Sequence, residues 1–100
     1  MITKLRVITM KQTIELEFNK SLTKLAGNPF GQDVYNQQVK DIINYESECI
    51  EIVLPERVDN IASSFIQGFF KSMVDEIGIK GIIDKITIIS SIANVKEMII

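Results

Sequence analysis

The chain lacks histidine and tryptophan altogether, and it contains only one cysteine and two prolines in 100 residues. Without histidine, the Ser–His and Cys–His arrangements of nucleophilic catalysis are excluded, and so are most zinc sites. Cys49 has no second cysteine for an internal disulfide, and a free cysteine in an apolar segment is most often a buried strand residue. We therefore expect a protein that is not an enzyme and that carries no metal or other cofactor.

Long hydrophobic runs and an excess of basic charge are also missing. The apolar runs are only a few residues long, too short for a transmembrane helix or a signal peptide. Lys and Arg number 11 against 13 Asp and Glu, and no basic stripe is visible, so nucleic-acid and membrane binding have no electrostatic support. With 46% hydrophobic and 24% charged residues, the composition is that of a globular protein. The length predicts a single domain over residues 1–100, which we expect to be cytoplasmic.

The first third of the chain predicts a β-hairpin followed by a break. Residues 4–9 (KLRVIT) are strand-like, and residues 13–18 (TIELEF) alternate with the period of a half-buried strand. A short polar stretch separates them, so we expect an antiparallel hairpin. Residues 26–32 (AGNPFGQ) combine Asn-Pro with two glycines, which predicts a turn. A helix is expected after this turn, from an N-cap at Asp33 to about residue 46.

The middle of the chain predicts a strand and then the clearest helix. Residues 48–54 (ECIEIVL) form a short apolar run ended by Pro55, which is typical of a central strand covered on both faces. From about residue 61 to 77, apolar residues recur at i, i+3 and i+4, and Gly78 fits the position just past a helix C-terminus. The apolar stripe of this helix consists of Ala62, Phe65, Ile66, Phe69, Phe70, Met73, Val74 and Ile77.

The end of the chain predicts one more strand and one more helix. Residues 85–90 (KITIIS) are read as a second buried strand, and a final helix is expected to begin with Ser90 or Ser91 as its N-cap. The order is then β-β-α-β-α-β-α. Strands that alternate with helices predict an α/β sandwich with a largely parallel inner sheet covered by helices. The N-terminal hairpin would make this sheet mixed.

This order, with two serines opening the helix after the central strand, resembles the STAS fold of sulfate transporters and anti-sigma-factor antagonists. The chain is most similar to a bacterial and phage branch, the STAS-like domain family of unknown function. The resemblance rests on "VLPERV" (53–58), on "ASSF" (62–65), where the family has a small-small-Phe pattern, and on "ANVKEMI" (93–99). It departs from the family at Leu54, where the family has Asp, and at Arg57, where it has Gly.

The resemblance implies a non-enzymatic regulatory domain that binds another protein, with a histidine-kinase-type ATPase as one partner. The contact surface would be the N-terminal end of the helix over residues 61–77. A second hypothesis from a different class is a small stand-alone inhibitor or accessory protein, phage-borne, that acts as a homodimer through an exposed strand edge or its final helix. An enzyme is the third hypothesis and has the least support.

Ser63 and Ser64 allow two interpretations. Ser64 followed by Gln67 is a capping-box pattern, and Asp59 or Asn60 would cap instead if the helix began earlier. The other interpretation follows from the resemblance, because anti-sigma-factor antagonists are phosphorylated on the first Ser of Asp-Ser-Ser-Gly. Here Ala62 and Phe65 replace the flanking Asp and Gly, and only the serine pair remains. A phosphate on Ser63 would add nearly two negative charges at a helix N-terminus.

Two further sets of residues are candidates for chemistry. The Gly27–Gly31 loop has neither a Walker lysine nor the Gly-x-Gly-x-x-Gly spacing, so we interpret it as a turn. The chain also carries a dispersed acidic set, which consists of Glu46, Glu48, Glu51 and Glu56. The period of a strand places Glu48 and Glu51 on opposite faces, so we expect a solvated rim and not a metal or acid–base cluster.

Overall fold

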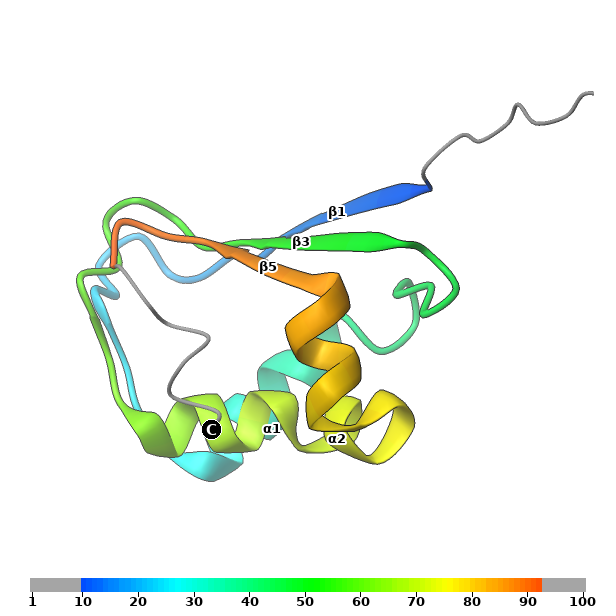
Figure 1. Cartoon of the computed structure of the whole chain (residues 1–100). Coiled ribbons are helices and arrows are strands. Elements are labelled where there is room, and N and C mark those ends of the chain that lie inside the picture. The colour runs from blue at the N-terminus through cyan, green and yellow to red at the C-terminus, as the bar shows by residue number, and fades with distance from the viewer. Residues whose placement is uncertain (1–9, 93–100) are drawn as a thin grey trace, which may run out of the picture.

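A computed structural model describes residues 10–92 of the chain (Figure 1). Its elements are β1 (Lys11–Glu15), β2 (Lys24–Leu25), α1 (Asn28–Gln38), β3 (Cys49–Val53), β4 (Asn60–Ile61), α2 (Ser63–Lys85) and β5 (Ile86–Ile89). The expected strand at residues 4–9, and with it the hairpin, lies outside the described residues. The final helix expected after Ser91 lies outside them as well.

Three parallel strands form the main sheet, in the order β1-β3-β5. The prediction that residues 48–54 form the central strand is therefore confirmed. Each successive strand is added on the same side of the previous one. The crossovers through α1 and α2, if both have the usual right hand, therefore place the two helices on the same face of the sheet. Figure 1 shows α1 and α2 together on that face. Every strand pair among residues 10–92 is parallel, so the described part of the sheet is not mixed.

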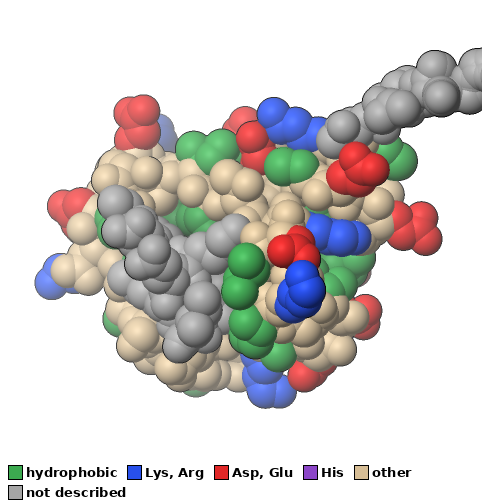
Figure 2. Space-filling model, in the orientation of Figure 1, with side chains coloured by type: hydrophobic (Ala, Val, Ile, Leu, Met, Phe, Trp, Pro, Cys, Tyr) green, Lys and Arg blue, Asp and Glu red, His purple; other side chains and the backbone are tan. Residues whose placement is uncertain are grey.

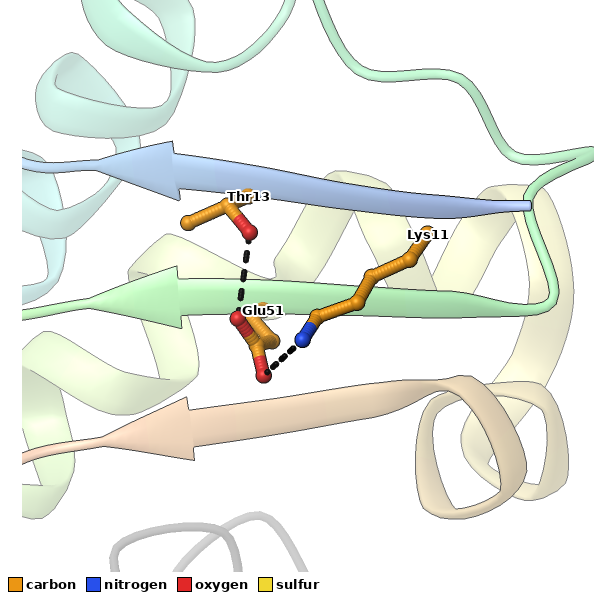
Figure 3. A network of polar contacts seen from close by, with 3 residues as sticks. All are labelled: Lys11, Thr13 and Glu51. Atoms are coloured by element: carbon orange, nitrogen blue, oxygen red, sulfur yellow. Dashed lines mark hydrogen bonds and ion pairs between the residues drawn. The ribbon is translucent and has the colours of Figure 1, made fainter. Parts of the chain in front are cut away.

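The prediction that helices cover both faces of β3 is wrong for the described residues. Ile50 and Ile52 are buried against the helices, whereas Cys49, Glu51 and Val53 alternate with them and are only half-buried. On the helix-free face, the Glu51 carboxylate accepts a hydrogen bond from Thr13 at 3.0 Å and pairs with Lys11 at 3.2 Å (Figure 3). These polar side chains make that face compatible with water. The strand therefore alternates between buried and half-buried residues, as expected for a sheet with helices on one face.

The first helix begins six residues earlier than predicted and also ends earlier. Pro29 lies in the first turn of α1, where its missing N–H costs nothing. Asp33 is an exposed residue inside the helix and not its N-cap. The Gly27–Gly31 stretch is therefore a helix start and not a free turn. After Gln38 the chain turns, and the N–H groups of both Val39 and Lys40 donate to the Tyr35 carbonyl.

Glycines allow α1 and α2 to approach each other closely. A Cβ on Gly68 would overlap the backbone carbonyl of Asn28, and a Cβ on Gly31 would overlap the backbone of Phe65. Neither glycine has a positive φ. Because glycine has no side chain, the backbones of the two helices can come into direct contact where they cross.

The second helix confirms the predicted apolar stripe. Phe65, Ile66, Phe69, Phe70 and Met73 are each at most 2% exposed and form the centre of the core. Gly78 has a φ of 73° and interrupts the helix where its C-terminus was predicted. The chain then continues in a second helical segment over residues 79–85, which the sequence analysis did not identify, and enters β5. In the described part of the chain, no helix combines the length and apolar character needed to cross a bilayer.

Candidate interaction surface

A short second sheet places the starts of the two helices side by side. β2 and β4 pair in parallel, with Leu25 opposite Ile61, and both of these side chains are buried. α1 begins shortly after β2, and α2 begins shortly after β4. The two helix N-termini therefore lie next to each other. Neither strand is predicted from the sequence, because two residues are too few to show a period.

Ser64 connects the two helix starts. Its hydroxyl oxygen accepts a hydrogen bond of 3.0 Å from the backbone N–H of Gly27, the N-cap residue of α1. The N-cap of α2 is Ala62, which makes no side-chain cap. The predicted capping box of Ser64 and Gln67 is therefore wrong, since both serines lie inside the first turn.

The alternative caps are wrong for a related reason. Asn60 belongs to β4, and the backbone N–H groups of Asp59 and Asn60 donate to the carbonyl of Thr23 at 2.9 and 3.3 Å. The Ala62 N–H donates to the Leu25 carbonyl at 2.8 Å. These bonds keep the chain extended up to Ala62, so the helix cannot begin earlier.

The remaining candidate residues are exposed polar residues at the start of α2 and just before it. Asp59, Asn60, Ser63 and Gln67 are all exposed, and Ser63 and Gln67 lie one turn apart on α2. We call these four residues the contact face. Ser64, the fifth candidate, is half-buried beside them and holds Gly27. The structure thus separates the two serines, because one hydroxyl is exposed and the other is used inside the fold.

Both helix starts present backbone donors that have no acceptor within the fold. Neither α1 nor α2 has Asp or Glu in its first turn or a side-chain cap. Among residues 10–92, the N–H groups of Asn28, Ser63 and Ser64 donate to no acceptor. Free N–H groups and the helix dipole give such an end partial positive charge. Because the N-terminal ends of α1 and α2 lie side by side, they attract negatively charged or carbonyl-rich groups to the surroundings of the contact face.

The dispersed acidic residues do not assemble a site. No group of three or more potential metal ligands occurs within the described range, residues 10–92. Glu51 is engaged by Lys11 and Thr13. The expected solvated rim therefore describes the exposed Glu46, Glu48 and Glu56, but not Glu51.

Two hollows flank the carboxyl end of β3, where open α/β sheets often bind ligands. They measure about 370 and 480 Å³ and share Val53 and Leu54. Arg57 lines the smaller one, but its guanidinium already donates to the carbonyls of Phe18 and Asn19 at 2.5 and 3.2 Å. Among the strands of residues 10–92, the order runs in one direction and lacks the reversal that opens a crevice in such sheets.

A scan against protein-family models and searches of curated proteins and of solved structures found no match to this chain.

Proposed function

We propose that this chain is a non-enzymatic interaction domain of the STAS-like type. It binds a protein partner through the contact face formed by Asp59, Asn60, Ser63 and Gln67. The observation that supports this proposal best is the exposure of Ser63 and Gln67 at the start of a helix that contacts with neighbouring elements hold in place. The Ser64–Gly27 hydrogen bond and the β2–β4 pair fix that start, so the face is presented with little conformational freedom to lose on binding.

The partner surface that suits this face is acidic or rich in carbonyl groups. The two neighbouring helix starts offer free N–H groups and partial positive charge, neither first turn contains a carboxylate, and Asp59 is the one carboxylate of the contact face. The family resemblance suggests a histidine-kinase-type ATPase as the partner. In that arrangement the partner supplies the nucleotide chemistry and this chain supplies the recognition surface.

Phosphorylation of Ser63 would switch such a contact off. The Ser63 side chain is exposed and makes no hydrogen bond within residues 10–92, whereas the Ser64 hydroxyl is occupied by Gly27. A phosphate would bring a charge of about −1.5 to −2 to this helix start. The helix dipole tolerates that charge, so folding is retained. An acidic partner surface would be repelled by it.

The second candidate function is a stand-alone inhibitor or accessory protein that forms a homodimer. It is favoured by exposed isoleucines on consecutive elements, because Ile79 on α2 is 38% exposed and Ile89 on β5 is 43% exposed. Figure 2 shows hydrophobic side chains in a strip over the second segment of α2. Light scattering of the purified protein distinguishes the two functions, since a homodimer at micromolar concentration supports the second.

Capture of a partner from the native host tests the proposed function. Wild-type protein, Gln67→Glu and Gln37→Glu are used as baits. Both substitutions add one negative charge at an exposed helical position, but Gln37 lies near the C-terminal end of α1, away from the contact face. We expect a protein that wild type and Gln37→Glu retain and Gln67→Glu loses. Equal retention by all three baits contradicts the assignment of the face.

A further inference from the structure

A polar hollow of about 430 Å³ lies between the end of α1, the loop that follows it and the later part of the first segment of α2. Its volume falls in the range of small-molecule sites. It is lined by Tyr35, Lys40, Tyr45, Ser72, Asp75 and Glu76, among others. None of these residues belongs to the contact face, so the hollow is a separate feature of the molecule.

Two tyrosines leave one phenolic hydrogen in this hollow without an acceptor. The hydroxyl oxygens of Tyr35 and Tyr45 are 2.6 Å apart, and either can be the donor. Each phenol carries one hydrogen, so one bond between them uses only one of the two. Among residues 10–92 no other hydrogen bond of either hydroxyl exists, and Tyr35 is only 4% exposed. A bound molecule with an acceptor oxygen would satisfy the second hydrogen.

Tyr45 is held in place, and its hydroxyl stays protonated. The Lys85 ammonium donates to the Tyr45 carbonyl at 2.6 Å, which ties the loop to the end of α2. Burial raises the pKa of Tyr45 above its ordinary value, and the hydrogen bond with Tyr35 and the negative charge of Glu76 add to this rise. The Tyr45 hydroxyl therefore keeps its hydrogen at neutral pH.

Charges of both signs line the same hollow without being paired. Asp75 and Glu76 supply carboxylates and Lys40 supplies an ammonium group. The ion pairs within residues 10–92 are Lys11–Glu51 and Lys80–Asp84, so none of these three groups is engaged in one. Carboxylates accept hydrogen bonds from a cationic amine, and an ammonium and a phenol donate to a carboxylate. A ligand that carries both groups would complement both sets.

We propose that this hollow binds a small zwitterion that carries an ammonium and a carboxylate group, the simplest class being the free α-amino acids. Asp75 and Glu76 hold the ammonium group. Lys40 and the spare phenolic hydrogen of the Tyr35–Tyr45 pair hold the carboxylate. The site does not depend on the contact face, so the proposed function and this inference can fail independently.

Titration of isotope-labelled full-length protein, followed by amide chemical shifts, tests the inference. The probes are the individual protein α-amino acids, with ethylamine and acetate as half-ligands that carry only one of the two groups. We expect at least one amino acid to produce saturable shifts centred on Tyr45, Ser72 and Glu76, with a Kd of about 1 mM or lower. Both half-ligands should bind at least about tenfold more weakly, because each leaves one set of groups unused.

Matched substitutions localise the site. Glu76→Gln should weaken binding by at least about tenfold, whereas Glu48→Gln, the same change at an exposed position outside the hollow, should leave it unchanged. If Glu76→Gln fails to give a wild-type spectrum, Asp75→Asn takes its place. The inference is overturned if no amino acid gives saturable shifts, if ethylamine or acetate binds equally well, or if the hollow variants bind like wild type.

Discussion

The hydroxyl of Ser64 accepts a hydrogen bond from the backbone N–H of Gly27, 3.0 Å away and 37 positions earlier in the sequence. This bond joins the start of α2 to the start of α1. It also gives the two neighbouring serines different environments, because the Ser63 side chain is exposed and makes no hydrogen bond among residues 10–92. The stability of the fold should depend on Ser64 and not on Ser63.

Ser64→Ala is expected to lower the free energy of unfolding by about 1 kcal/mol, because a half-buried Gly27 N–H loses its acceptor. Ser63→Ala should change it by less than about 0.5 kcal/mol, as for an exposed side chain without a partner. Denaturant titration of both variants against wild type provides the comparison. Equal losses in the two variants would contradict the distinct roles given to the serines.

Gly68→Ala should destabilise the protein by about 1–3 kcal/mol, because the added methyl group meets the Asn28 backbone and the helices must separate. Gly81→Ala is the matched control. Its added methyl group would meet the Ile77 side chain, with Cβ at 2.8 Å, and not the backbone of a facing helix, and alanine is favoured over glycine inside a helix, so this change should cost less. Thermal melts of both proteins decide the matter, and a Gly68→Ala variant as stable as Gly81→Ala would argue against the close crossing.

Phe69→Ala should cost about 3–5 kcal/mol, which is much of the stability of a domain of this size. The Phe69 ring contacts the rings of Tyr35, Phe65 and Phe70, with centroids 5.0–6.0 Å apart. Phe18→Ala, at a half-buried ring on the margin of the core, should cost clearly less. A melting curve of Phe69→Ala close to that of wild type would show that α2 is oriented differently.

The raised pKa of Tyr45 predicts a loss of stability at high pH. The folded state holds the Tyr45 proton more tightly than the unfolded chain, whose tyrosines ionise near pH 10. The contribution to stability is therefore complete below pH 10 and declines as the pH rises above it. Tyr45→Phe lacks this group, so its stability should fall less steeply above pH 10. The free energy of unfolding of both proteins is measured by denaturant titration between pH 9 and pH 11. An equally steep decrease with pH in the two proteins would contradict the role given to Tyr45.

The sequence predicted those parts of the fold that long periodic segments determine. The stripe from Phe65 to Met73 has enough turns to show its period, and residues 48–54 are bounded by clear breaks. The start of α1 was misplaced because Asn-Pro and two glycines resemble a turn. Only the packed structure shows that Pro29 fits a first helical turn and that Gly31 makes room for α2. Such a contact between distant segments leaves no local pattern in the sequence.

The residues of the proposed contact face can be named from the sequence, but their hydrogen-bond partners cannot. The contact-face residues were named from the sequence, whereas the partner of Ser64 was not, because Gly27 lies on another element. The Tyr35–Tyr45 pair was missed for a similar reason, since Tyr45 lies beyond the observed end of α1 in a loop with no motif.

The affinity of the captured partner for Ser63→Glu tests the proposed function most directly. The contact-face proposal predicts that this variant melts like wild type, because a carboxylate is tolerated at the start of a helix. It also predicts that partner binding weakens by more than tenfold, or about 1.4 kcal/mol, because the added charge must be desolvated at the contact. Gln37→Glu, with the same added charge elsewhere, should bind normally. Normal binding by Ser63→Glu would contradict both the contact face and the switch at Ser63.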